Sequence, residues 1–294
     1  VMNLLFINWN PDPILFSIGG FSLRWYSVFW FIAIWAASQV VYKLYQYKKL
    51  PLDSYLNLFI YSCIGIFAGA RLGHCLFYDP EFYFSHPWEI ILPIHFLPNG
   101  DWTFTGYAGL ASHGGTLGLI IALLLFCRKT KIHYLDILDI MGIAAPLAAG
   151  FIRIANLMNS EIIGIPTQVP WAFIFERVSP VPRHPAQLYE ALAYFIIFIL
   201  ILTIAKRKKG NYKKGFYFGL CITLIFTFRF FIEFLKERQV DFENTLPIDM
   251  GQILSIPFML LGISILLTRY SNKTPLHEYL SLIHISEPTR HLRI

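Results

Sequence analysis

The amino-acid sequence predicts an all-α integral membrane protein with seven transmembrane helices. Only 14% of its 294 residues are charged, against about 25% in soluble proteins, and 56% are hydrophobic. Seven apolar segments are long enough to cross a bilayer, and Lys and Arg cluster in alternate connections between them. A soluble domain of this length would need more polar surface, so that class is excluded.

Each predicted helix has the roughly 20 mostly apolar residues that are needed to cross the hydrocarbon layer. The segments are residues 22–46, 54–78, 107–127, 134–157, 186–206, 215–236 and 248–269. We expect them to form one membrane domain over residues 1–282. Residues 283–294 begin with IHISEPTR, which resembles translated sequencing-adapter read-through, and we expect them to be a non-native tail.

The basic residues predict the orientation, because Lys and Arg accumulate on the cytoplasmic side of a membrane. They follow the first, third and fifth spans: Lys43, Lys48 and Lys49; Arg128, Lys129 and Lys131; and a cluster from Lys206 to Lys214. Residues 79–106, after the second span, contain neither Lys nor Arg. This predicts an N-terminus outside and a C-terminus in the cytoplasm. The net charge of +6 is explained by topology and does not predict nucleic-acid binding.

Two outer connections are too rich in aromatic residues and proline to be simple turns. Residues 79–106 hold Trp88 and Trp102, and residues 158–185 hold Trp171 and five prolines. Tryptophan favours the boundary between membrane and water. We therefore predict an interfacial arm over about 79–106 and a small extracytoplasmic cap over about 158–185.

Polar residues inside a span indicate function, because Arg or Asp at a helix centre costs about 2.5–3.5 kcal/mol. His113 lies six residues into the third span and is followed by Gly114, Gly115 and Gly118. These glycines leave bare backbone beside an imidazole. Two interpretations remain open: a packing surface for a neighbouring helix, or a site that a lipid headgroup approaches.

The fourth span carries an arginine with polar neighbours at its outer end. Arg153 and Asn156 are three residues apart and share a helical face. Asn159, Glu161 and Gly164 follow where the chain leaves the membrane. A guanidinium group matches a phosphate with two parallel hydrogen bonds, whereas lysine acts as a point charge. A structural Arg–Glu pair is the alternative.

The sixth span repeats the combination with Arg229 and Glu233, four residues apart. An isolated buried arginine would be prohibitive, so Glu233 is the expected counter-ion of Arg229.

Other polar residues also lie at or within the spans, including Glu190 in the fifth. Arg71 lies in the second span, His184 lies at the entrance to the fifth, and Tyr26 lies just inside the first. Tyrosine is also common at membrane interfaces, which is the alternative for Tyr26. Asp136 and Asp139 lie near the inner boundary, and we expect solvated or helix N-terminal charges there.

Arginines, a histidine and carboxamides without a metal-ligand cluster favour an anionic phospholipid headgroup as ligand, with no metal and no cofactor expected. Preorganised arginines stabilise a phosphate that leaves as a dianion, and a histidine or carboxylate can accept a proton from a nucleophile. Two other classes remain: a transporter of an anionic metabolite, which the absence of an internal repeat disfavours, and a structural membrane-assembly protein.

The segment GFIRIANLMNSEIIG resembles the signature of the prolipoprotein diacylglyceryl transferase family. The matching positions are Gly150, Arg153, Ala155, Asn156, Asn159, Glu161 and Gly164. The resemblance extends to LRWYS around Tyr26, GARLG around Arg71, SHGGTLG around His113, RHPAQLYE around His184, RFFIEF around Arg229, and DMGQILSIPF. It covers residues 14 to 268.

The resemblance implies transfer of the diacylglyceryl group of phosphatidylglycerol to the lipobox cysteine of preprolipoproteins, at the outer side of the bacterial inner membrane. Phosphatidylglycerol, other membrane lipids and preprolipoprotein signal peptides are the implied partners. Arg153 and Arg229 would hold the phosphate, and His113 would be a base or headgroup ligand. The implied substrate-binding residues are Tyr26, Arg71, Gly114, Gly115, Asn156, Asn159, Glu161, Gly164, His184 and Glu233. Some members carry a tyrosine one turn before the sixth-span arginine; here Ile225 removes that hydroxyl.

Overall fold

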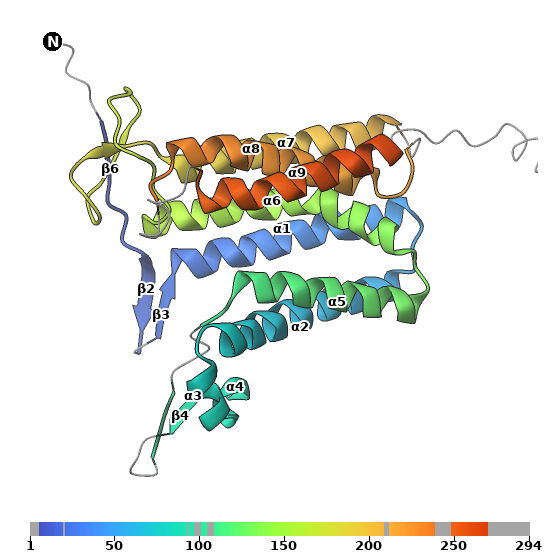
Figure 1. Ribbon diagram of the computed structural model, residues 1–294, viewed down its shortest axis with the longest axis horizontal. Coiled ribbons are helices and arrows are strands. Elements are labelled where there is room, and N and C mark those ends of the chain that lie inside the picture. The colour runs from blue at the N-terminus through green and yellow to red at the C-terminus, as the bar shows by residue number, and fades with distance from the viewer. Residues whose placement is uncertain are drawn as a thin grey trace, which may run out of the picture.

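A computed structural model describes residues 6–19, 21–92, 94–96, 101–104, 109–208, 212–238 and 248–269. Seven long helices run side by side along the long axis of the molecule (Figure 1). They are α1 (Trp25–Tyr47), α2 (Leu52–Phe77), α5 (Ser112–Thr130), α6 (Tyr134–Asn159), α7 (Ala186–Lys208), α8 (Phe216–Ile232) and α9 (Met250–Arg269). All except α5 are long and apolar enough to cross a membrane, so the described residues contain six candidate spans, one fewer than predicted.

The helix α5 corresponds to the third predicted span and is polar at both ends. It has 19 residues, with His113 near its start and Arg128 and Lys129 in its last turn. It pairs with α2 through glycines on both helices: a Cβ added at Gly118 would lie 2.9 Å from the Cα of Gly69. Such contacts let two backbones approach closely. Helix packing therefore accounts for this glycine patch.

The helix α6 is the centre of the larger helix group, packing on α1, α7 and α8, while α9 packs on α8. Its buried face is apolar near one end, where Ile137, Ile140 and Ile143 are almost fully enclosed. These residues are spaced by three positions and so lie on one side of the helix. The other end of the same helix carries Arg153.

Short strands that were not predicted from the sequence form a sheet, and two of them lie within residues 158–185, the proposed cap. The strands β1 (Ile7–Trp9), β6 (Phe173–Phe175) and β7 (Pro182–Arg183) form a sheet in the order β1-β6-β7. The β1–β6 pair is parallel and the β6–β7 pair antiparallel. Trp9 Nε1 donates a hydrogen bond to the Leu157 carbonyl, 2.9 Å away, which ties this sheet to the end of α6.

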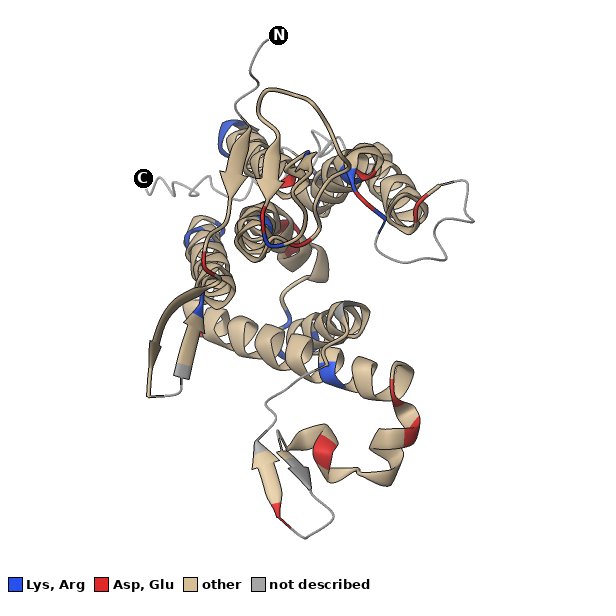
Figure 2. Cartoon of the chain, turned by 90° about the vertical axis from the view of Figure 1, so that its left-hand side faces the viewer, with Lys and Arg blue, Asp and Glu red and all other residues tan. Residues whose placement is uncertain are grey.

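A hairpin and the arm occupy the same end of the molecule as the cap (Figure 1). The strands β2 (Ile14–Ile18) and β3 (Phe21–Arg24) pair antiparallel immediately before α1. The described part of residues 79–106, the proposed arm, contains α3 (Pro80–Ser85), α4 (Trp88–Ile91), β4 (Ile94–Phe96) and β5 (Trp102–Phe104). It stands apart from the larger helix group and carries acidic residues (Figure 2).

Arg71 of α2 ties the arm to the helices. Its guanidinium donates hydrogen bonds to the backbone carbonyls of Glu89 and Ile90. The same group lies 4.9 Å from the centre of the Tyr83 ring, within the range of a cation–π contact. Arg71 Nη1 also donates to the Gly109 carbonyl at 3.4 Å, so this side chain links α2 to the arm and to the segment before α5.

Two aspartates of α6 organise the opposite end of the bundle. Asp136 pairs with Lys48 at 3.0 Å and with Lys214 at 2.6 Å. Asp139 is buried, not solvated, and accepts hydrogen bonds from the backbone N–H groups of Gly215, at 2.8 Å, and Phe218, at 3.0 Å. Because these groups belong to the first turn of α8, Asp139 caps a neighbouring helix.

Candidate active site

Arg153 of α6 and Arg229 of α8 line one cavity of about 220 Å³. The cavity is also lined by Lys236, in the segment after α8, and by Gly251 and Leu254 of α9. Arg153 lies in the last two turns of α6 and Arg229 in the last turn of α8, at the end of the helix bundle that carries the cap. The two arginines predicted from separate spans are therefore brought to a shared space.

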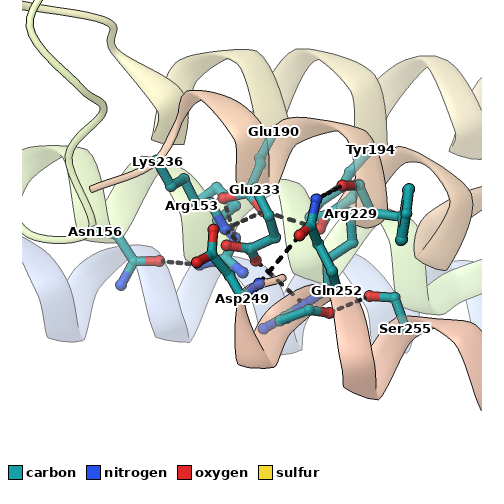
Figure 3. Close-up of polar contacts among 12 residues, drawn as sticks. Arg153, Asn156, Glu190, Tyr194, Arg229, Glu233, Lys236, Asp249, Gln252 and Ser255 are labelled. Atoms are coloured by element: carbon teal, nitrogen blue, oxygen red, sulfur yellow. Dashed lines mark hydrogen bonds and ion pairs between the residues drawn. The ribbon is translucent and has the colours of Figure 1, made fainter. Parts of the chain in front are cut away.

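A continuous series of ion pairs joins the two arginines, and we call it the ion-pair chain (Figure 3). Arg153 Nε lies 3.1 Å from Glu190 Oε2, and Lys236 Nζ lies 3.0 Å from Glu190 Oε1. The same Nζ lies 3.1 Å from Glu233 Oε1, which is 3.6 Å from Arg229 Nε. Glu190 is fully buried, so its carboxylate depends on these cations for compensation.

The polar residues after Arg153 continue the site toward the cap. Arg153 Nη1 donates to Asn156 Oδ1 at 3.2 Å, and Asn156 Nδ2 donates to Glu161 Oε1 at 2.6 Å. The spacing of three predicted that Arg153 and Asn156 share a helical face, and the hydrogen bond joins them there. Asn159 ends α6, and no hydrogen bond is found between it and these neighbours in the described part of the chain.

Gly164 lies where three backbone segments meet. Its N–H donates to the His184 carbonyl at 3.0 Å, and a bridge pairs it with Lys236. A Cβ at this position would lie 2.7 Å from the Leu235 carbonyl oxygen, too close for any side chain. Gly164 thus allows the segment that carries Lys236 to pack against the loop after α6.

His184 faces the cap side of this junction. Its Nδ1 lies 3.2 Å from the Tyr189 hydroxyl, which accepts a hydrogen bond from Trp171 Nε1 at 2.8 Å. Partial burial lowers the pKa of His184 below its ordinary value, because desolvation disfavours the charged imidazole. His184 supports the cap through this contact and through its backbone.

The start of α9 closes the cavity on another side. A Cβ added to Gly251 would lie 2.5 Å from Glu233 Cδ, so a larger residue here would displace the Glu233 carboxylate. Asp249, just before α9, accepts a hydrogen bond from Arg238 Nε at 2.8 Å. Gln252 donates to the Phe230 carbonyl and is almost fully buried. The motif DMGQ therefore fixes the position of α9.

Several predicted residues lie elsewhere. Tyr26 is in the first turn of α1, and Arg71 is engaged with the arm. His113 is exposed on α5, where Gly114 and Gly115 pack against α2. These residues do not line the cavity. Their binding and catalytic roles remain predictions.

Lys236 was not predicted from the sequence, and Glu190 was given no role there. Lys236 falls three residues after Glu233, so Arg229, Glu233 and Lys236 have helical spacing, a signal that could have found it. Tyr194, one turn after Glu190, was also missed, and its hydroxyl donates to Glu190 Oε1 at 3.4 Å. No group of three or more His, Cys, Asp or Glu side chains is arranged to hold a metal ion within the described ranges.

Comparison with known proteins identifies a family that this chain matches. The family model described as prolipoprotein diacylglyceryl transferase matches residues 13–268. Proteins named phosphatidylglycerol–prolipoprotein diacylglyceryl transferase are similar over nearly their whole length. The Bacteroides fragilis protein is 60% identical over 260 residues, which is 88% of this chain and 94% of the relative. The Chloroherpeton thalassium protein is 42% identical over 259 residues, with 88% and 92% covered, and the Tolumonas auensis protein is 40% identical over 266 residues, with 90% and 98% covered. Because the family model covers most of the chain and these relatives are similar over nearly their whole length, this chain belongs to the prolipoprotein diacylglyceryl transferase family.

Proposed function

We propose that this chain transfers the diacylglyceryl group of phosphatidylglycerol to the lipobox cysteine of preprolipoproteins, and that its cavity holds the donor's phosphate. Family membership makes the chain a transferase of lipoprotein maturation. The observation that carries the assignment of the site is that Arg153 and Arg229, from separate helices, line one cavity. Two guanidinium groups can bind the non-bridging oxygens of a phosphate from two sides.

The reaction is a substitution at a glycerol carbon. The cysteine sulfur forms a bond to that carbon, the carbon–oxygen bond to phosphate breaks, and glycerol phosphate leaves with the electron pair. The thiol proton passes to a base. The phosphate changes from a singly charged diester to a doubly charged monoester, so cations in a site of low dielectric stabilise the transition state more than the bound substrate.

The other predicted residues enter as proposals with separate roles. Asn156, Glu161 and Gly164 shape the wall beside Arg153, and Glu233 orients Arg229; the hydrogen bonds and ion pair described above support this. His113 remains the proposed base or headgroup ligand.

The remaining proposed substrate contacts, like Asn156, Glu161 and Gly164, are not among the residues that line the cavity. They are Tyr26, Arg71, Gly114, Gly115, Asn159 and His184.

For the membrane topology, we propose α5 as a seventh span, with the N-terminus outside and the C-terminus in the cytoplasm. Lys48 and Lys214 gather around Asp136 at the end opposite the cap, which supports a cytoplasmic assignment of that end. The arm and the cap would then lie at the outer face of the bacterial inner membrane. The cavity would open toward the outer leaflet, within a single domain over residues 1–282. The proposed tail, residues 283–294, lies outside the described residues.

A lipidation assay tests the function. Membranes that contain the protein are incubated with a lipobox peptide and phosphatidylglycerol, and the mass of the peptide is measured. We expect a gain equal to one diacylglyceryl group, which disappears when the cysteine is replaced by serine. Product formation no greater than with empty membranes would reject the proposal, and movement of an anion across liposomes without peptide modification would favour a transporter.

A further inference from the structure

Lys236 lies at the middle of the ion-pair chain. Its Nζ contacts Glu190 and Glu233 at 3.0 and 3.1 Å, and its side chain is only 5% exposed. Surface ion pairs contribute little, whereas removing one partner of a buried pair leaves a costly uncompensated charge. The burial of Lys236 therefore makes it part of the site.

The ion-pair chain carries one more positive charge than negative. The other charged residues that line the cavity are compensated, because Arg238 pairs with Asp249 and Glu237 pairs with Arg183. Arg153, Lys236 and Arg229 are cations, and Glu190 and Glu233 are the carboxylates between them. Each arginine is already paired with one carboxylate. When a phosphate binds, the guanidinium N–H groups must turn in part toward its oxygens, and the carboxylates then depend on Lys236.

We propose that Lys236 is a positioning residue for the transfer reaction: it holds Glu190 and Glu233, through them orients Arg153 and Arg229, and supplies the excess positive charge that favours phosphate departure. This inference rests on the proposed function. Because the phosphate gains a negative charge as it leaves, the excess charge acts more strongly on the transition state than on donor binding. Loss of Lys236 should therefore lower kcat as well as raise KM.

Single substitutions test the charge and the position separately. We expect Lys236→Met to lower kcat/KM for phosphatidylglycerol by about a hundredfold or more, as for truncation of a buried charge pair, with most of the loss in kcat. Lys236→Arg keeps the charge and should remain within about tenfold of the wild type. The matched control is Lys214→Met, which removes a lysine paired with Asp136 at the far end of the bundle and should leave kcat/KM unchanged.

A double variant separates charge balance from packing. In Lys236→Met the ion-pair chain is neutral and two carboxylates have lost a cation; adding Glu190→Gln restores one excess positive charge. We expect the double variant to be at least about tenfold more active than Lys236→Met, a change of about 1.4 kcal/mol in activation free energy. A double variant no more active than the single variant would overturn the proposal.

Inhibition by inorganic phosphate provides a second measurement that does not depend on the folding of Lys236→Met. Glu190→Gln alone raises the excess charge to two, so phosphate should inhibit its residual activity at a lower concentration than it inhibits the wild type. Equal or weaker inhibition would contradict the inference. Wild-type membranes without lipidation activity would instead reject the proposed function, so the two failures are distinguishable.

Discussion

Replacing Arg153 with lysine tests whether the planar guanidinium group is needed at the cavity. The arginine uses separate nitrogens for Glu190, at 3.1 Å, and Asn156, at 3.2 Å, while it lines the proposed phosphate site. A lysine has one nitrogen and cannot keep both contacts and also bind two phosphate oxygens. Each hydrogen bond to a charged group contributes about 1.5–3 kcal/mol. Loss of one or two of them, about 1.5–6 kcal/mol, predicts a fall of about 10- to 20,000-fold in kcat/KM, at about 1.4 kcal/mol for each factor of ten.

The assay is the conversion of a lipobox peptide by membranes matched for protein level, over a range of phosphatidylglycerol concentrations. Arg177→Lys is the matched control, because Arg177 bonds to the Met158 carbonyl and Ser160 in the cap and does not line the cavity. We expect the control to keep wild-type activity. If Arg153→Lys keeps activity within about threefold of wild type, less than 0.7 kcal/mol, the argument from guanidinium geometry is refuted.

Three further predictions concern other parts of the molecule. Asp139→Ala should lower the free energy of unfolding of the purified protein by about 1–2 kcal/mol, as for loss of a helix cap, and so lower its melting temperature. An unchanged melting temperature would contradict the capping role. His113→Gln should reduce lipidation; recovery at raised pH supports proton abstraction, whereas an unchanged pH dependence supports binding only. Since burial lowers the pKa of His184, stability should fall as pH decreases from about 6.5 toward the lower folded-state pKa. Thermal melts of His184→Gln should show a smaller fall over that range, and equal slopes would exclude His184 as the cause.

The helices could be predicted well because their signal is local. The fifth predicted span, 186–206, corresponds to α7 (Ala186–Lys208), and the fourth, 134–157, to α6 (Tyr134–Asn159). The cap strands could not be predicted, because they are two or three residues long and pair across the sequence, as in Ile7 with Phe173. Such short segments have too little periodic pattern to identify.

The candidate site was only partly predictable. The spacing of Arg229 and Glu233 identified one ion pair between residues close in sequence. The polar residues after Arg153 identified the hydrogen-bonded group that contains Asn156 and Glu161. The spacing of Glu233 and Lys236 offers a signal for that pair, but the contacts of Glu190 with Arg153 and Lys236 could not be predicted, because they depend on how α7 and the end of α8 face α6. For the glycines after His113, the sequence left two interpretations, a helix-packing surface or a site that a lipid headgroup approaches. Their contacts with glycines on α2 support the packing interpretation.

The contact between Asp139 and α8 sets the longitudinal alignment of the two helices that carry the arginines. Asp139 and Arg153 belong to the same helix, about 21 Å apart at 1.5 Å per residue. A slip of α8 by one turn, about 5.4 Å, would move Arg229 away from the level of Arg153. The Asp139 carboxylate at one end of the bundle thus fixes the relative position of Arg153 and Arg229 at the other end. A substitution of Asp139 can therefore disable the enzyme although Asp139 does not contact a substrate.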